Sequence, residues 1–222
     1  MDEGLSVLGL SEPPFFDEAF QARLHDLFVW RRDVRRFQTE PLPPGALERL
    51  IGEACLGPSV GLSQPWRFVV VDQPARRSAV AANFRSANRE ALDCYPGEQR
   101  ARYAQLKLAG LEEAPCHLAV FIDEATPVGH GLGRRTMPEM LRYSAVTAIC
   151  HLWLAARAQG VGMGWVSILD PAAVGSALDV PAEWPLIGYF CLGYPVDCSA
   201  EPELAQAGWE HRISPADLII RR

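Results

Sequence analysis

The chain has 222 residues, of which 49% are hydrophobic and 22% are charged, so it has enough apolar material for the core of an ordinary globular protein. Its length suits one domain, and we treat residues 1–222 as one. The net charge of −6 argues against nucleic-acid binding and against docking on an anionic membrane.

We expect a cytoplasmic protein. No apolar run reaches the ~18 residues that span a bilayer, and Met1–Leu10 lacks the basic start of a secretory signal. The cysteines form no Cys-x-x-Cys pair and lie largely in apolar contexts, which predicts reduced thiols in the core rather than disulfides. They are Cys55, Cys94, Cys116, Cys150, Cys191 and Cys198.

The first half of the chain predicts two helices and one strand. A loose arm to Pro14 precedes a helix that Asp17 caps, and Pro43-Pro44 opens a second helix. The predicted elements are a helix over 17–30, a helix over 46–56, a polar loop over 58–65 and a buried strand over 66–71.

The second half predicts three more strands and a long helix. Residues 74–112 form either two helices, broken at Tyr95-Pro96-Gly97, or a mobile lid. Further elements are strands over 116–122, 161–168 and 186–192, helices over 138–159 and 171–178, and a tail over 195–222. The helix over 138–159 is apolar on most sides, so we expect it in a core or a subunit interface, with His151 buried.

This order of elements predicts an α+β fold. It is not the strict strand–helix alternation of a Rossmann sheet. The sequence also contains no Walker A motif and no Gly-x-Gly-x-x-Gly after a strand, so nucleotide binding through either motif is not expected.

The most informative motif is Arg31-Arg32-Asp33-Val34-Arg35-Arg36-Phe37. Four guanidiniums within six residues form a local anion site that suits a phosphate. The alternative is a set of solvated cations at a helix C-terminus. Asp33 is unexpected in an anion site, because its carboxylate repels the anion.

A second motif runs from Pro58 to Phe68, with the sequence PSVGLSQPWRF. Its serines, glycine and glutamine offer several donors in one short loop, and such a loop can contact a flat heterocycle. The alternative is a Pro-bounded turn with capping serines.

Together these motifs resemble those of the nitroreductase-like flavoprotein superfamily, and the segments 162–167 and 209–212 match it in the same order. The resemblance implies a central mixed, mainly antiparallel sheet flanked by helices. It also implies a homodimer in which the arm 195–222 is swapped onto the partner and FMN binds at the interface. The segment 83–112 is then a lid over the flavin, the alternative being a solvated helical hairpin.

The resemblance also implies a flavin site. The FMN phosphate and ribityl chain lie on the arginine segment, the second loop approaches the isoalloxazine, and a C-terminal basic residue adds to the phosphate site. The implied residues are Arg31, Arg32, Asp33, Arg35, Pro58, Ser59, Gly61, Ser63, Ser167 and Arg212.

Two positions are similar to one branch of the superfamily, which fragments reduced FMN with oxygen into 5,6-dimethylbenzimidazole and erythrose 4-phosphate. Most members have Ser where this chain has Asp33. The resemblance implies that Asp33 and Ser167 are catalytic, Asp33 as a general base. The alternatives are that Asp33 only orients the arginines and that Ser167 only bonds to backbone.

In this interpretation FMN arrives reduced, as a substrate, from a separate NAD(P)H-dependent flavin reductase, and O₂ is the co-substrate. The five histidines show no metal-ligand spacing, so we expect no metal. The alternatives are an NAD(P)H-dependent FMN nitroreductase, a reductive dehalogenase, or a flavin-delivery protein without chemistry.

Overall fold

The computed structural model describes residues 13–222, so most of the predicted arm to Pro14 lies outside the described residues. A four-stranded sheet in the order β1-β2-β4-β3 lies at the centre, and all three of its ladders are antiparallel. The strands are β1 (Trp66–Val70), β2 (Cys116–Ile122), β3 (Gly162–Val166) and β4 (Leu186–Gly193). The α+β prediction is confirmed.

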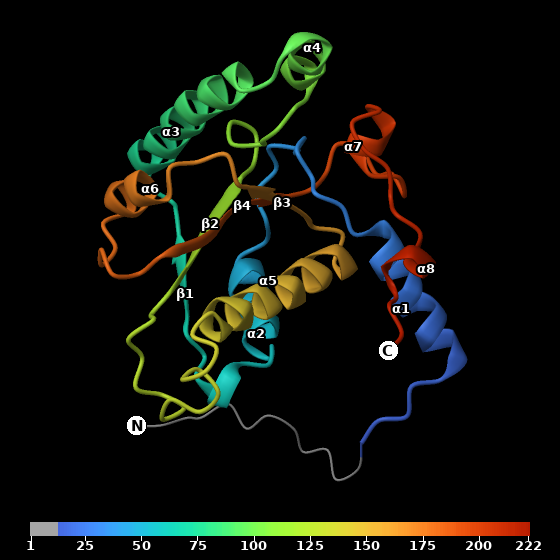
Figure 1. The fold of residues 1–222 in the computed structure, drawn as a ribbon, viewed down its shortest axis with the longest axis vertical. Coiled ribbons are helices and arrows are strands. Elements are labelled where there is room, and N and C mark those ends of the chain that lie inside the picture. The colour runs from blue at the N-terminus through green and yellow to red at the C-terminus, as the bar shows by residue number, and fades with distance from the viewer. Residues whose placement is uncertain (1–12) are drawn as a thin grey trace.

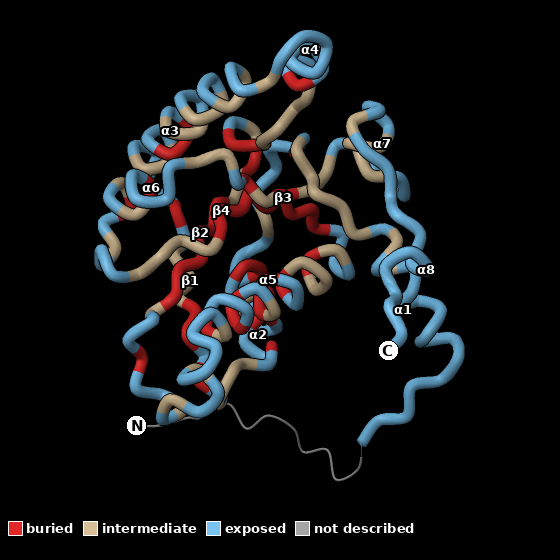
Figure 2. The backbone as a smooth tube through the Cα atoms, viewed as in Figure 1, coloured by how far each residue is buried: buried red, intermediate tan, exposed pale blue. Residues whose placement is uncertain are grey.

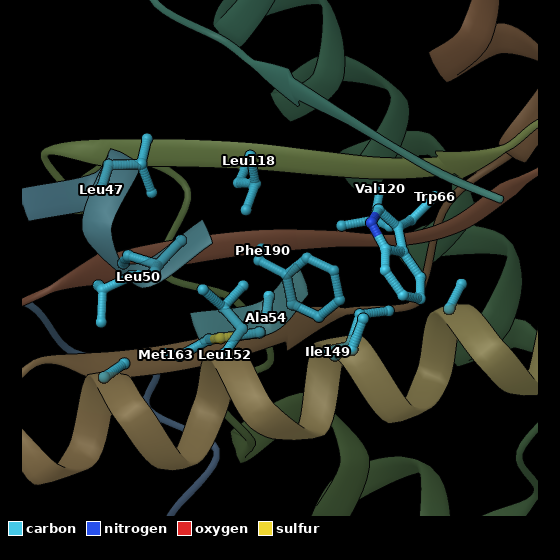
Figure 3. Close-up of a cluster of buried hydrophobic side chains, with 14 of the residues drawn as sticks. Leu47, Leu50, Ala54, Trp66, Leu118, Val120, Ile149, Leu152, Met163 and Phe190 are labelled. Atoms are coloured by element: carbon cyan, nitrogen blue, oxygen red, sulfur yellow. The ribbon is translucent and has the colours of Figure 1, made fainter. Parts of the chain in front are cut away.

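Two helices cover one face of this sheet, as Figure 1 shows: α5 (Met140–Ala158) and α2 (Ala46–Cys55). Alternate residues of β2, which are Leu118, Val120 and Ile122, point to this face, as the period of a strand requires. Figure 3 shows Leu50 of α2 and Leu152 of α5 packed against the strands, and both side chains are fully buried.

The other face packs against α3 (Pro74–Asp93) and α6 (Pro171–Leu178). Ala119 and Phe121, the residues of β2 between those above, belong to this second apolar cluster. The sheet is therefore buried on both faces, which accounts for the continuous apolar run of β2.

The remaining elements lie at the periphery, where most of the tube in Figure 2 is pale blue or tan, for exposed and intermediate residues. They are α1 (Glu18–Trp30), the 3-10 turn η1 (Val60–Leu62), α4 (Gly97–Gln105), α7 (Glu203–Gln206) and α8 (Pro215–Leu218). Asp17 caps α1 through the backbone N–H of Phe20 at 2.7 Å, as predicted. Yet α1 has no buried residue, and Phe28 is half exposed.

Three expectations need correction. The predicted strand over 161–168 ends at Val166, because its ladder with β4 ends there and Asp170 already caps α6. The helix α5 is buried on one side only, so His151 is exposed rather than a core residue. Of the six cysteines only Cys191 is buried, although all are free thiols.

The region 74–112 forms two helices, interrupted between Asp93 and Gly97. The helix α3 is fixed by Val80 and Ala81, which are buried against the sheet, and α4 lies outside it. A lid over 83–112 stays a prediction. Within the described part of the chain no helix is both long and apolar enough to cross a membrane.

A buried pair of polar side chains, His117 and Tyr189, joins the neighbouring strands β2 and β4. His117 Nδ1 lies 2.8 Å from the Tyr189 hydroxyl, and both side chains are almost fully buried. Burial, with the nearby Arg77 cation as a smaller cause, lowers the pKa of His117 to about 4. The imidazole is therefore neutral at pH 7 and must gain a charge in the core when the pH falls.

We expect this pair to make the fold acid-sensitive between pH 6.5 and 4. The unfolded chain binds a proton at His117 in that window and the folded chain does not, so stability falls as the pH falls, by about 3 kcal/mol. Denaturant unfolding at pH 7 and pH 4 measures this loss. The His117→Gln variant keeps a hydrogen-bonding side chain without the titration, and it should lose about 3 kcal/mol less than the wild type. Equal losses in both proteins would contradict this assignment.

Candidate functional site: a cationic pocket beside strand β3

The segment after α1 extends the sheet beyond its edge strand β3. Asp33 forms a parallel bridge with Met163, and the Val34 N–H donates to the Met163 carbonyl at 3.0 Å. A Cβ at Gly164 would lie 2.0 Å from the Val34 carbonyl oxygen, so only glycine permits this approach. The Gly-x-Gly sequence of β3 thus allows the arginine segment to lie against the sheet.

Asp33 is held at both carboxylate oxygens. Its Oδ1 accepts the Trp165 backbone N–H at 2.8 Å, and its Oδ2 pairs with Arg35 Nε at 3.0 Å. Its side chain is 33% exposed and that of Arg35 is 11% exposed. The carboxylate is therefore oriented by protein contacts but still reachable from the pocket.

Four of the predicted cations line one pocket of about 180 Å³ with Asp33. Its lining residues are Arg31, Arg32, Asp33, Arg35, Pro202, Glu203, Leu204 and Arg212. The tail thus brings Arg212 to the arginine segment of its own chain, while phosphate binding by these residues stays a prediction. Four guanidiniums face two carboxylates here, an excess that suits a phosphate dianion.

The four arginines differ in their contacts. Arg32 donates to the carbonyls of Ser199 and Ala200 in the tail, among others, so it holds the tail in place. Arg35 donates to the Lys107 carbonyl at 3.0 Å besides pairing with Asp33. Arg31 lies over the Trp153 ring, 4.8 Å from its centroid.

The cations also repel one another. Burial and then the charges of Arg212, Arg31 and Arg157 lower the pKa of Arg32 below its ordinary value. An anion bound among these groups relieves that repulsion. Glu203 relieves it little, because it already pairs with Arg36 at 2.6 Å.

The second predicted motif forms the turn around η1. The Ser59 Oγ accepts the Gln64 N–H at 3.1 Å, and the Pro58 carbonyl accepts the Thr147 hydroxyl at 2.8 Å. Ser59 therefore closes this turn through its side chain, although it makes no side-chain cap to η1. Gly61 packs against Gly129 and lines an open pocket with the Gly-rich loop over 129–133. Ser63 is buried, and its hydroxyl finds no hydrogen-bond partner among the described residues.

The two predicted motifs are not brought together within one chain. The Val60 N–H donates to Ser144 near the start of α5, whereas Trp153 near its end donates to the Arg32 carbonyl. Trp153 follows Ser144 by nine positions in the helix, which is about 13 Å along the axis and roughly half a turn around it. Figure 1 shows the two loops at opposite ends of α5.

Ser167 lies one residue beyond β3 and is exposed. It follows Trp165, whose N–H binds Asp33, by two positions, which corresponds to about 7 Å of extended chain. The structure therefore places Ser167 on the same edge as Asp33 without joining the two side chains by a hydrogen bond.

Sequence reasoning missed Trp153, which we interpreted only as an apolar residue of the long helix. The Arg31 guanidinium lies over its ring, and its Nε1 donates to the Arg32 carbonyl at 3.0 Å. The available signal was the indole N–H, because a buried tryptophan needs an acceptor.

The residues present fit a flavin nucleotide. The cationic pocket suits its phosphate, and the buried Ser63 hydroxyl beside the η1 turn has unused hydrogen-bonding capacity. The described residues contain no cluster of three or more His, Cys, Asp or Glu that could hold a metal ion.

Known proteins resemble this chain along most of its length. A protein of Rhodospirillum rubrum named 5,6-dimethylbenzimidazole synthase is 54% identical over 90% of this chain and 94% of the relative. A protein of Rhodobacter capsulatus with the same name is 43% identical over 89% of this chain and 96% of the relative. The structure of iodotyrosine deiodinase bound to FMN and 3-iodo-L-tyrosine has a TM-score of 0.67 at 26% identity, over 79% of this chain and 91% of that one. The model of the nitroreductase family matches residues 28–194, which include the arginine segment, the η1 turn and β3, and the chain belongs to that family.

Proposed function

We propose that this chain converts reduced FMN and O₂ into 5,6-dimethylbenzimidazole, the lower-ligand base of vitamin B12, and erythrose 4-phosphate, with the pyrimidine part of the flavin ring leaving as a further product. The observation that carries the proposal is the 54% identity to a 5,6-dimethylbenzimidazole synthase over 90% of the chain. The site supports it, because a carboxylate faces the same pocket as four guanidiniums. The reduced flavin supplies the electrons that activate oxygen, and the protein binds and orients it.

Each site residue has a role in this proposal. Arg31, Arg32, Arg35 and Arg212 hold the phosphate, with Arg32 also fixing the tail. Asp33 accepts a proton from the ribityl carbon attached to the ring, and the Trp165 N–H and Arg35 orient it for that step. Ser167 donates a hydrogen bond to the ring system or to the oxygen bound there. Pro58, Ser59, Gly61 and Ser63 contact the isoalloxazine.

This assignment requires two copies of the chain. The cationic pocket and the η1 turn of a single copy contact opposite ends and opposite sides of α5, so the helix lies between them. A two-fold dimer solves this if the η1 turn of the partner meets the pocket. The exposed side of α5 supports the proposal, since it carries Tyr143 and Val146, and exposed apolar patches mark interfaces.

The reductant reaches the site, in this proposal, as reduced FMN made by a separate NAD(P)H-dependent flavin reductase in the cytoplasm. The second candidate is reductive dehalogenation, which the similarity to iodotyrosine deiodinase favours. Its lower identity of 26%, against 54% for the synthase, makes it the weaker candidate.

We expect the purified protein to make 5,6-dimethylbenzimidazole when mixed with reduced FMN and air, as detected by mass spectrometry. Recovery of intact oxidised FMN as the sole product would reject the proposal. Reduction of 3-iodotyrosine by the flavin-loaded protein would instead favour the dehalogenase.

We expect the Asp33→Asn variant to separate binding from chemistry. The amide keeps an acceptor for the Trp165 N–H but loses the negative charge, so product formation should fall about 100-fold or more. FMN should bind at least as tightly as before, because a repulsive charge has left the phosphate pocket. Fluorescence titration measures the affinity, and a native rate of product formation would exclude Asp33 as the base.

We expect two inactive variants to complement each other if the site spans two subunits. Asp33→Asn and Gly61→Val are mixed at equal amounts, denatured together and refolded. Half of the dimers are then hybrids, each with one native site, which gives about a quarter of the wild-type activity. Refolded single variants are the controls. Absence of recovery from the mixture, with wild type refolding to full activity, would place the whole site in one chain.

A further inference from the structure

Three aromatic rings join α4 to the C-terminal tail. Tyr95 stacks on Tyr103 at 4.8 Å between centroids, and Trp209 of the tail packs edge-on against Tyr95 at 5.5 Å. Trp209 also lies 6.2 Å from Tyr103. Pairs at these separations stabilise beyond the area that they bury.

This aromatic cluster is fixed on the α4 side. Tyr103 is only 6% exposed, and its hydroxyl lies 2.7 Å from Asn88 Oδ1 of α3. Burial raises the pKa of Tyr103, so its hydroxyl stays protonated and able to donate to Asn88. Trp209 therefore packs on a rigid support.

The tail is anchored at a second place, beside the cationic pocket. Arg32 donates to the carbonyls of Ser199 and Ala200, and Glu203 pairs with Arg36. From there α7 leads to Trp209, whose backbone N–H donates to the Leu204 carbonyl at 2.9 Å. The chain over 199–209 is thus held at both of its ends.

Arg212 follows Trp209 by three residues, a reach of about 10 Å at most. Its neighbours in the chain, from 210 to 214, are exposed, yet Arg212 lines the pocket with Arg31, Arg32 and Arg35. A long cationic side chain on an exposed segment loses conformational freedom when it binds an anion, and a nearby anchor reduces that loss.

We propose that Trp209 is a positioning residue that holds Arg212 at the cationic pocket and thereby makes the site prefer a flavin that carries a phosphate over riboflavin. The inference rests on the proposed function, in which the pocket binds the phosphate of FMN. Because Trp209 is seated on α4, the same contact makes the position of Arg212 depend on the position of α4.

The test is the ratio of the dissociation constants of riboflavin and FMN, both oxidised, measured by flavin fluorescence on the full chain. Arg212→Met should lower this preference for FMN about 10-fold or more, since a charge-assisted contact to phosphate is lost. Trp209→Leu should lower it in the same direction, and Trp209→Phe should restore most of it. A double-mutant cycle decides whether both act on one interaction: Trp209→Leu should change the preference little in an Arg212→Met background.

Trp184→Leu is the matched control. Trp184 also lies near an arginine, Arg67, but it belongs to the cluster on the α3 and α6 side of the sheet. The Trp184→Leu variant should prefer FMN over riboflavin by the same factor as the wild type.

Two outcomes distinguish the possible failures. If wild type binds neither flavin, or binds both equally, the phosphate site of the proposed function is wrong and the inference falls with it. If wild type prefers FMN but Trp209→Leu keeps the full preference, or lowers it additively with Arg212→Met, Trp209 does not act through Arg212. A loss of affinity for both flavins by the same factor would likewise reject positioning and assign Trp209 a general structural role.

Discussion

The pairing of Asp33 and Val34 with β3 is the contact on which the candidate site depends. β3 is an edge strand, so one row of its backbone groups lacks a partner strand. The Val34 N–H binds the Met163 carbonyl, and the Asp33 carboxylate takes the Trp165 N–H. These two hydrogen bonds give the Met163 carbonyl and the Trp165 N–H partners at the edge of the sheet. They also fix the direction in which the neighbouring arginine side chains leave the backbone.

The same contact explains how a carboxylate can lie in an anion pocket. One carboxylate oxygen of Asp33 accepts a backbone N–H and the other pairs with Arg35. The negative charge of Asp33 is therefore offset by the contacts that orient its side chain. Arg31 and Arg212 still add positive charge to the pocket. The two interpretations of Asp33, as an orienting ion-pair partner and as a base, are thus compatible, because a third of its side chain stays exposed.

The sequence predicted the layers of the fold better than its boundaries. The strand over 116–122 and the helix over 46–56 were predicted from their apolar residues, and the structure contains both as β2 and α2. The prediction that the cysteines and His151 are buried was wrong for all of them except Cys191, because apolar neighbours in sequence do not determine which way a side chain points. The end of β3 was also misplaced, because the length of a ladder depends on its partner strand.

The candidate site shows the same division. The arginine segment was identified from its residue types, whereas the roles of β3 and Arg212 came from the resemblance to the family, and the structure brings all three together. The aromatic support of Arg31 by Trp153 and of the tail by Tyr95 and Tyr103 was not predicted. Such contacts join positions more than a hundred residues apart, and no local pattern records them.

Several exposed apolar surfaces are candidate contacts between the two copies that the proposed site requires. They occur on the outer side of α5, on α1 and at Leu218–Ile220 of the tail, while both faces of the sheet are covered. A two-fold axis beside α5 would cover the exposed side of that helix in both copies at once, and it would place the start of one α5 near the end of the other. In the dimer that we propose, the apolar character of α5 that overpredicted burial within one chain has a physical cause: one side of the helix packs in its own core and the other side packs against the second copy.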